Sequence, residues 1–322
     1  MLTKWNENRR YSKLPLRVYG LLLAAILLFF FAAQWKVSPS HLINIVRQNA
    51  PLGIVAIAQT LVLLMGGIDL SVGAVMSLTN ILSTALMAGN PDNILLGVTV
   101  SLGFALLIGF VNGIIVARFK MPPFLITMAM ATIIQGGYYV YTRGIPRGSL
   151  PDAFRVISEG WLGPVPIAGL VWLSVWGALS LVLYKTPYGR HVYITGANPQ
   201  TAYLSGIPTM GITVSVYMLC SLLAGLAGLI LTAFIGVPST GVGDSFTLNS
   251  IAASVVGGTS FVGGVGTLEG TFPGVLIMVL LQSTLTILNI PEAGKSISQG
   301  VVIAVMVGIN MRVRKPKRRK TA

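Results

Sequence analysis

Residues 66–73 read Gly-Gly-Ile-Asp-Leu-Ser-Val-Gly, and Asp69 within them is the only charged residue between Arg47 and Asp92. Asp69 therefore lies in a long apolar region, where an ionised carboxylate is costly and marks either a functional site or a polar turn at the bilayer edge. The paired glycines before it permit a sharp change of backbone direction. The octet therefore predicts a hairpin or a broken helix at this point.

The composition places the chain among integral membrane proteins. Hydrophobic residues make up 54% of the 322 residues, charged residues make up 9%, and the mean hydropathy is +0.80. These values exclude an ordinary soluble domain. We expect an all-α polytopic membrane protein with about ten transmembrane helices, or eight as the alternative, because a span needs about 20 apolar residues. The runs lie at about 18–34, 46–65, 71–88, 94–117, 123–142, 165–184, 211–235, 246–262, 267–289 and 295–311.

The eighth run is the weakest of these candidates. Gly257 and Gly258 interrupt it, so it fits either a full span or a broken helix. No segment between the runs resembles a soluble domain, and the whole chain, 1–322, is predicted to be a single transmembrane domain.

Basic residues gather on one predicted side of the membrane. The net charge is +14, and more than half of the 22 Lys and Arg residues lie in two tails, 1–17 and 312–322. Placing both tails in the cytoplasm also places Arg118, Lys120, Lys185 and Arg190 there, which fits the positive-inside rule and requires an even number of spans. We expect the tails to contact at most anionic lipid headgroups. Nucleic-acid binding is not expected.

The residues that carry most enzyme chemistry are sparse and scattered. Cys220 is the single cysteine and the only histidines are His41 and His191, on opposite sides of the predicted membrane. Residues 258–262 begin like a nucleophile elbow, but Val262 replaces the closing glycine. No cluster has metal-ligand spacing. The sequence therefore predicts a chain that is not an enzyme and binds no metal or cofactor.

The segment 185–210 is predicted to be a polar cytoplasmic loop containing one short helix. Asn198 suits the N-cap, Pro199 the first turn and Gly206 the left-handed C-terminal position, which together predict a helix over 199–205. So short a helix needs a surface to pack on, and its apolar cluster is Ala202, Tyr203 and Leu204. Two readings remain open: a helix lying on the membrane, or a lever docked on a soluble partner that moves the membrane helices.

Four ordered blocks of sequence resemble one family. They are the octet at 66–73, Asn112-Gly113 with Pro-Pro-Phe-Leu-Ile-Thr at 122–127, Thr-Pro-Tyr-Gly-Arg at 186–190 with the residues up to Gly206, and the glycines from 257 to 274. Over about 44–311 the chain resembles the permease subunits of bacterial ATP-binding-cassette importers for ribose and related sugars, a group that includes galactofuranose and autoinducer-2 permeases. It differs from common forms of the family at Gln135, Tyr203 and Glu269.

The resemblance implies how the chain would work. It implies a bacterial plasma (inner) membrane permease that pairs with an identical or related permease, two cytoplasmic ATPases that bind the coupling helices, and an extracytoplasmic sugar-binding protein. ATP would be bound and hydrolysed by the partner subunits. The residues implied to couple the chain to the ATPase are Gly189, Arg190, Gly196, Asn198, Ala202, Tyr203, Leu204 and Gly206.

Polar residues within the predicted spans are the candidates for the solute path, because a hydroxyl-rich solute needs hydrogen-bonding partners when it leaves water. Hydrogen bonding between helices is the alternative role for each. The candidates are Gln59, Asn80, Asn112, Thr127, Gln135, Asn249 and Gln282.

A separate group is predicted to have a structural or gating role. The Asp69 carboxylate can accept from the backbone N–H of Ser71 or Val72 and cap the third span. The group consists of Gly66, Gly67, Asp69, Ser71, Gly73, Gly257 and Gly258. The alternative function is an ion-coupled secondary transporter that uses Asp69 and Glu269 as intramembrane acids.

Overall fold

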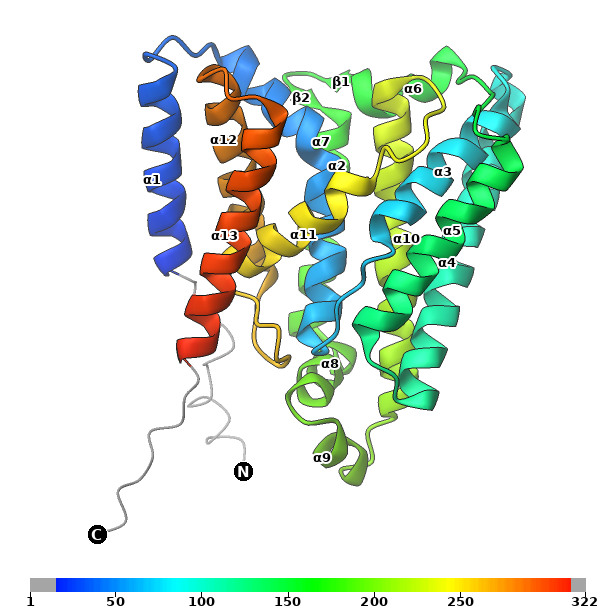
Figure 1. The fold of residues 1–322 in the computed structure, drawn as a ribbon, viewed down its shortest axis with the longest axis vertical. Coiled ribbons are helices and arrows are strands. Elements are labelled where there is room, and N and C mark those ends of the chain that lie inside the picture. Colours follow the sequence, from blue (N-terminus) through cyan, green and yellow to red (C-terminus); the bar gives the residue numbers. More distant parts are fainter. Residues whose placement is uncertain (1–15, 314–322) are drawn as a thin grey trace.

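The computed structural model describes residues 16–313, and in this part of the chain nearly all regular structure is helical (Figure 1). The only described sheet is a hairpin of β1 and β2, paired antiparallel through Trp161–Pro166 and Leu162–Val165. The elements are α1 Leu16–Ala32, α2 Pro39–Leu64, α3 Val72–Met87, η3 Pro91–Asn93, α4 Ile94–Phe119, α5 Pro123–Thr142, α6 Asp152–Glu159, β1 Trp161–Leu162, β2 Val165–Pro166, α7 Ile167–Lys185, α8 Pro187–Ala197, α9 Pro199–Leu204, α10 Thr209–Ile235, α11 Asp244–Val256, α12 Leu268–Ile287 and α13 Glu292–Val313.

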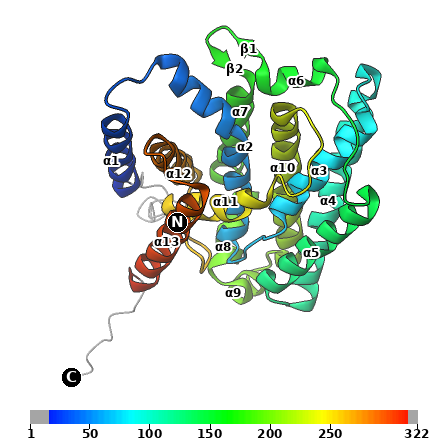
Figure 2. The ribbon, with the colours of Figure 1, turned by 45° about the horizontal axis from the view of Figure 1, so that its top comes forward.

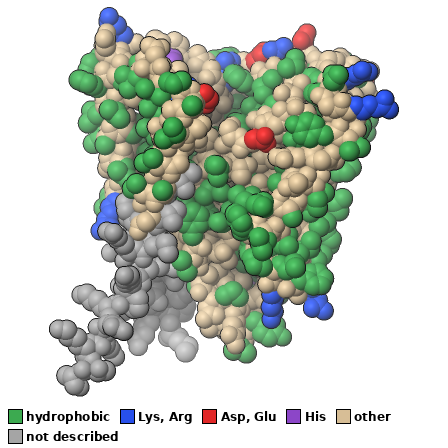
Figure 3. Space-filling model, in the orientation of Figure 1, with side chains coloured by type: hydrophobic (Ala, Val, Ile, Leu, Met, Phe, Trp, Pro, Cys, Tyr) green, Lys and Arg blue, Asp and Glu red, His purple; other side chains and the backbone are tan. Residues whose placement is uncertain are grey.

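Several helices have the length and apolarity of membrane spans. Five described helical segments meet both criteria: 91–119, 123–142, 167–185, 209–235 and 268–287, while α1 and α3 are shorter apolar helices. Figure 3 shows hydrophobic side chains over the flanks of the bundle and Lys and Arg gathered toward its two ends. This distribution suits a bundle surrounded by hydrocarbon. The expected all-α membrane protein is confirmed.

The bundle is built around α10. This helix packs against α4, α2 and α3, and it supplies one of the longest stretches of the buried core. Helices α3, α4 and α5 form one flank, while α1, α12 and α13 form the other, with α11 between them (Figures 1 and 2). The last turn of α13 and the short helices α8 and α9 lie toward the same end of the bundle, and α1 begins on the side facing that end and runs toward the opposite one (Figure 1). We call the first of these ends the α8–α9 end.

Two connections interrupt the apolar runs inside the bundle. The first, residues 65–71, leads from the end of α2 up to α3, which begins partway along the bundle (Figure 1). The second, residues 257–267, follows α11, which has 13 residues and is therefore about 20 Å long, shorter than the ~30 Å hydrocarbon core. We refer to these segments as the first break and the second break.

The second break corrects the expected run at 246–262, because the helix ends at Val256. A Cβ added to Gly257 would lie 2.5 Å from the carbonyl oxygen of Gly270, so α11 and α12 approach each other main chain to main chain there. Gly258 has a φ of +92°, which a side chain disfavours. Of the two forms left open by the sequence, the broken helix is the one observed.

Some elements were not expected from the sequence. The polar stretch after Lys185 forms a second helix, α8, which Thr186 caps by accepting from the Gly189 N–H. Between α5 and α7, residues 152–166 form α6 and the β1–β2 hairpin, elements that were not predicted from the sequence. The tails 1–15 and 314–322, which hold most of the basic residues of the two predicted cytoplasmic tails, lie outside the described residues.

Candidate functional site

The first break is organised around Asp69. Its side chain is fully buried, and its Oδ1 accepts from the Ser71 N–H at 2.8 Å and from the Ser71 hydroxyl at 2.5 Å. Asn112 on α4 donates from Nδ2 to the same hydroxyl at 3.1 Å. The expected hydrogen bond from the Ser71 N–H is present, but Asp69 does not cap α3: the helix begins at Val72, and its N-cap residue is Ser71, whose side chain makes no capping hydrogen bond. The break encloses the carboxylate, so the side chain of Asp69 is covered by protein on all sides.

Two further side chains satisfy the backbone of the first break. Thr127 on α5 accepts from the Leu70 N–H at 3.0 Å, and its hydroxyl lies 3.2 Å from the Ile68 carbonyl. Gln59 on α2, with its amide oriented to satisfy both groups, pairs with the main-chain N–H and C=O of Asp69, each at 3.2 Å. Buried backbone groups outside a helix need such partners. Gln59, Asn112 and Thr127 are therefore brought together as supports of one non-helical segment.

The other predicted path residues lie elsewhere. Asn80 holds the connection after α10: Nδ2 donates to Thr232 and to the Val237 carbonyl, both at 3.2 Å, and Oδ1 accepts from the Ser239 N–H at 2.8 Å. Asn249 on α11 and Gln282 on α12 face each other at 3.4 Å. Gln135 lies half-buried on α5, away from these groups. The predicted path residues thus form one cluster, one pair and two separate positions.

A hydroxyl cluster joins α2, α11 and α12 and was not anticipated. The Thr60 hydroxyl lies 2.7 Å from that of Thr271 and donates to Ser254 at 3.0 Å, and all three residues are fully buried. Ser254 also donates to the Ala56 carbonyl at 2.9 Å. The sequence offered only the presence of small hydroxyl residues in apolar runs as a signal. The cluster fixes α2 against both helices that flank the second break.

The predicted short helix is present at the α8–α9 end. The Asn198 side chain accepts from the Thr201 N–H at 3.0 Å and caps α9, and Gly206 follows with a φ of +79°. Ala202 is fully buried, whereas Tyr203 and Leu204 are 70% and 78% exposed. The apolar cluster therefore divides: one side chain anchors the helix and two project outward.

The remaining predicted coupling residues lie on α8. Gly189 is needed where the helix crosses the end of α7, since an added Cβ would lie 2.0 Å from the Leu183 carbonyl oxygen. Gly196, in the last turn of α8, lies against the carbonyl of Leu64, and Arg190 is exposed between the two glycines. The two glycines allow α8 to lie close against α7 and the end of α2.

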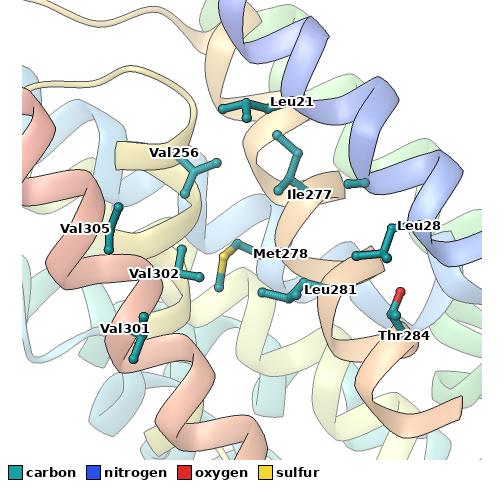
Figure 4. Close-up of a pocket in the computed structure, with 11 residues that line it drawn as sticks. Leu21, Leu28, Val256, Ile277, Met278, Leu281, Thr284, Val301, Val302 and Val305 are labelled. Atoms are coloured by element: carbon teal, nitrogen blue, oxygen red, sulfur yellow. The ribbon is translucent and has the colours of Figure 1, made fainter. Parts of the chain in front are cut away.

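A pocket of about 270 Å³ lies between α1, α11, α12 and α13 (Figure 4). Its one polar side chain, Thr284, already donates to the Leu280 carbonyl at 2.7 Å. This lining gives a hydroxyl-rich solute no partner, so the pocket is not a sugar site. It is lined by Leu21, Ala25, Leu28, Val256, Ile277, Met278, Leu281, Thr284, Val301, Val302 and Val305.

A bundle of apolar helices with two non-helical breaks, and a pair of short helices at one end, is the architecture of a polytopic membrane protein and suits a transport protein. The chain belongs to the family described as branched-chain amino acid transport system / permease component, which matches residues 41–309. It is accordingly a permease of an ATP-binding-cassette importer in the bacterial plasma membrane, a transport component rather than an enzyme.

Relatives match the chain over most of its length. The ribose import permease protein RbsC of Escherichia coli is 36% identical over 324 residues, covering 95% of this chain and 98% of the relative. RbsC of Bacillus subtilis is 34% identical and covers 89% of both chains, and the fructose import permease protein FrcC of Rhizobium meliloti is 33% identical and covers 84% and 78%. No solved structure gave a significant match.

The ion-coupled alternative is not supported. The relatives are components of ATP-binding-cassette importers. Both acids on which that alternative rested are also engaged by neighbouring hydroxyls: Asp69 by Ser71, and Glu269 by the hydroxyl of Tyr184.

Proposed function

We propose that the chain forms the membrane path for a sugar or sugar-like solute, and that separate ATPase subunits drive its import. The observation that carries the solute class is the 36% identity with a ribose import permease along 95% of this chain. Import permeases named for fructose and L-arabinose match as well. The family description names branched-chain amino acids, which makes these the second candidate solutes.

The assembly is proposed to contain three kinds of component besides this chain: a second permease, two ATPases and a binding protein. A second permease, identical or related, completes the path. Two ATPases bind at the α8–α9 ends and hold the ATP, and an extracytoplasmic binding protein delivers the solute. The exposed side chains of Tyr203 and Leu204 support a docked partner at α9. Two adjacent large apolar side chains that this chain leaves uncovered are typical of an interaction surface.

The topology is proposed to comprise ten passages with both termini in the cytoplasm. Eight passages are single helices, and two combine a short helix with a break: 65–71 with α3, and α11 with 257–267. The directions of α1, which begins on the side facing the α8–α9 end, and of α13, which ends toward it, support this count (Figure 1). The chain is then one transmembrane domain, 1–322, with basic cytoplasmic tails at 1–17 and 312–322 and a coupling segment at 185–210.

The solute path is proposed to pass the two breaks, where backbone and polar side chains replace continuous helix. Non-helical backbone at membrane depth is tolerated where it is enclosed by protein or lines a cavity. Four path candidates lie outside the cluster supporting the first break: Asn80, Gln135, Asn249 and Gln282. Gln59, Asn112 and Thr127 are assigned to gating support rather than to solute contact.

Competition for uptake separates the two solute classes. Cells that lack their own ribose and leucine uptake systems would express the chain with the ATPase and binding protein encoded beside it. We expect radiolabelled ribose or a related pentose or hexose to accumulate, and unlabelled leucine to leave that uptake unchanged. Accumulation of leucine that sugars do not reduce would contradict the sugar assignment and favour the second candidate.

A further inference from the structure

Three segments far apart in the sequence meet main chain to main chain where α2 ends. The Gly264 N–H donates to the Leu64 carbonyl at 2.8 Å. A Cβ added to Gly196 would lie 1.8 Å from that same carbonyl oxygen, and one added to Gly263 would lie 2.5 Å from the Gly196 carbonyl oxygen. We call Gly66, Gly196, Gly263 and Gly264 the glycine junction.

The junction connects α8 to both breaks at one point. Gly66 lies near the start of the first break, Gly263 and Gly264 lie in the second, and Gly196 belongs to the last turn of α8. A Cβ added to Gly263 would also lie 2.8 Å from the Gly66 nitrogen, and one added to Gly264 would lie 2.7 Å from the Ala197 Cα. With no side chains between these segments, a displacement of α8 by more than a few tenths of an ångström displaces the other two.

Tyrosines from α7 and α8 hold the second break beside this junction. The Tyr193 hydroxyl on α8 donates to the Gly266 carbonyl at 2.9 Å. The Tyr184 hydroxyl, at the end of α7, donates to the Glu269 carboxylate and accepts from the Leu268 N–H at 3.2 Å. Tyr184 and Tyr193 also interact with each other. Glu269 stands in the first turn of α12, so the three side chains tie α7, α8 and α12 together.

We propose that the glycine junction transmits movement of α8 and α9 to both breaks at once, and that Tyr193 and Glu269 are positioning residues that keep α8 engaged with the second break. The proposal rests on the proposed function, in which ATPases act on α8 and α9. It adds the contact through which they would act on the path. One displacement at the cytoplasmic end would then change both non-helical segments together.

The coupling ratio, meaning solute imported per ATP hydrolysed, tests this role. The full complex would be reconstituted in liposomes with ribose as the probe. Tyr193→Phe removes one hydroxyl and leaves the packing of the ring, so it should preserve assembly and lower the ratio by about two- to tenfold, the factor that corresponds to one net hydrogen bond. Glu269→Leu should lower the ratio by a similar factor, whereas Glu269→Gln, which keeps an acceptor for Tyr184, should restore most of it.

Tyr188 supplies the matched control. It lies on the same helix, and its hydroxyl bonds to Ser215 on α10 at 2.9 Å, away from the second break. Tyr188→Phe should leave the ratio within about twofold of the wild type, which is less than one net hydrogen bond would change it. A purely structural role for Tyr193 and Glu269 would reduce uptake and hydrolysis in parallel and leave the ratio unchanged, and that result would overturn the proposal.

A distance measurement needs ATP but no solute, so it stays informative if the solute class is wrong. In a Cys220→Ser background, spin labels at Ile194 and Phe119 report movement of α8 relative to α4, and labels at Ile194 and Val265 report α8 relative to the second break. All three side chains are exposed. We expect ATP to change the first distance and leave the second unchanged. A second distance that changes with the first, so that α8 slides past the break, contradicts the junction; two unchanged distances contradict α8 as a moving part.

Discussion

The Oδ1 atom of Asp69 accepts both the main-chain N–H and the hydroxyl of Ser71, at 2.8 and 2.5 Å, immediately before α3 begins. These two hydrogen bonds stabilise a buried acid that would otherwise be costly, and they lie where the first break ends. Asn112 on α4 binds the same Ser71 hydroxyl, so the start of α3 is tied to a neighbouring helix as well. The acid therefore has a structural reason to be present.

Two substitutions at Asp69 should show whether the residue is needed as a hydrogen-bond acceptor or for its charge. Asp69→Asn keeps an oxygen that can accept from the Ser71 N–H and should be mild. Asp69→Leu leaves the buried Ser71 N–H unpaired, at a cost of about 1–3 kcal/mol per unsatisfied group. The thermal unfolding midpoint of the purified chain in detergent should fall clearly for Leu only, together with uptake. Wild-type transport by the Leu variant would refute the account of Asp69.

Thr127 should matter for the same reason. Thr127→Val removes the acceptor for the Leu70 N–H and should destabilise the purified protein by about 1–3 kcal/mol. Thr132→Val on the same helix is the matched control, because Thr132 is exposed and its hydroxyl donates only to the Met128 carbonyl. Equal unfolding midpoints for the two variants would show that Thr127 does not support the break.

Gly206 should be required for coupling through α9. Its φ of +79° disfavours any side chain, and a left-handed residue other than glycine costs about 1–2 kcal/mol. Gly206→Val should therefore displace the end of α9 and lower solute-stimulated ATP hydrolysis. Gly211→Val, on α10 where an added Cβ meets nothing within 4 Å, is the control. Unchanged stimulation in the Gly206 variant would show that this helix cap is unimportant.

The two outward side chains of α9 should bind the ATPase. Burying a large apolar side chain contributes about 1.5–3 kcal/mol, so replacing Tyr203 and Leu204 together with Ser should weaken ATPase binding by at least about tenfold. Leu95→Ser, at an equally exposed leucine in the first turn of α4, is the control for expression and membrane insertion. Titration of the ATPase onto the permease in nanodiscs measures this. Equal affinity for the double variant and the wild type would argue that α9 lies on the membrane instead.

Hydropathy, together with the residues that typically begin and end helices, predicted much of the fold. The run at 123–142 coincides with α5, and those at 165–184 and 211–235 differ from α7 and α10 by at most two residues at each end. A long apolar run is a local property, so it survives folding unchanged. The two ends of α9 were predicted equally well, because the capping effects of Asn198 and Gly206 depend only on residues next to them in the sequence. Helix α8 was missed because a polar, glycine-containing stretch is typical of a loop.

The partners within the site could not be predicted. Polar residues in apolar runs identified Gln59, Asn112 and Thr127 as unusual, but their meeting at one break depends on how α2, α4 and α5 pack. The glycine junction is harder to predict than this cluster. In a sequence, a glycine that lets another segment's main chain approach closely cannot be told from a glycine that only allows a turn in its own segment. Glu269 stood out as an acid, but its contact with Tyr184 joins residues 85 positions apart and depends on how the chain between them folds.

ATP-driven uptake by the reconstituted complex tests the account most directly. Proteoliposomes containing this chain, its ATPase and its binding protein would be loaded with ATP on the nucleotide-accessible side, and radiolabelled ribose uptake measured with ionophores that abolish all ion gradients. The account predicts that uptake continues with ionophores present and stops when ATP is replaced by a non-hydrolysable analogue. Uptake that persists without ATP and collapses with the ion gradient would contradict it.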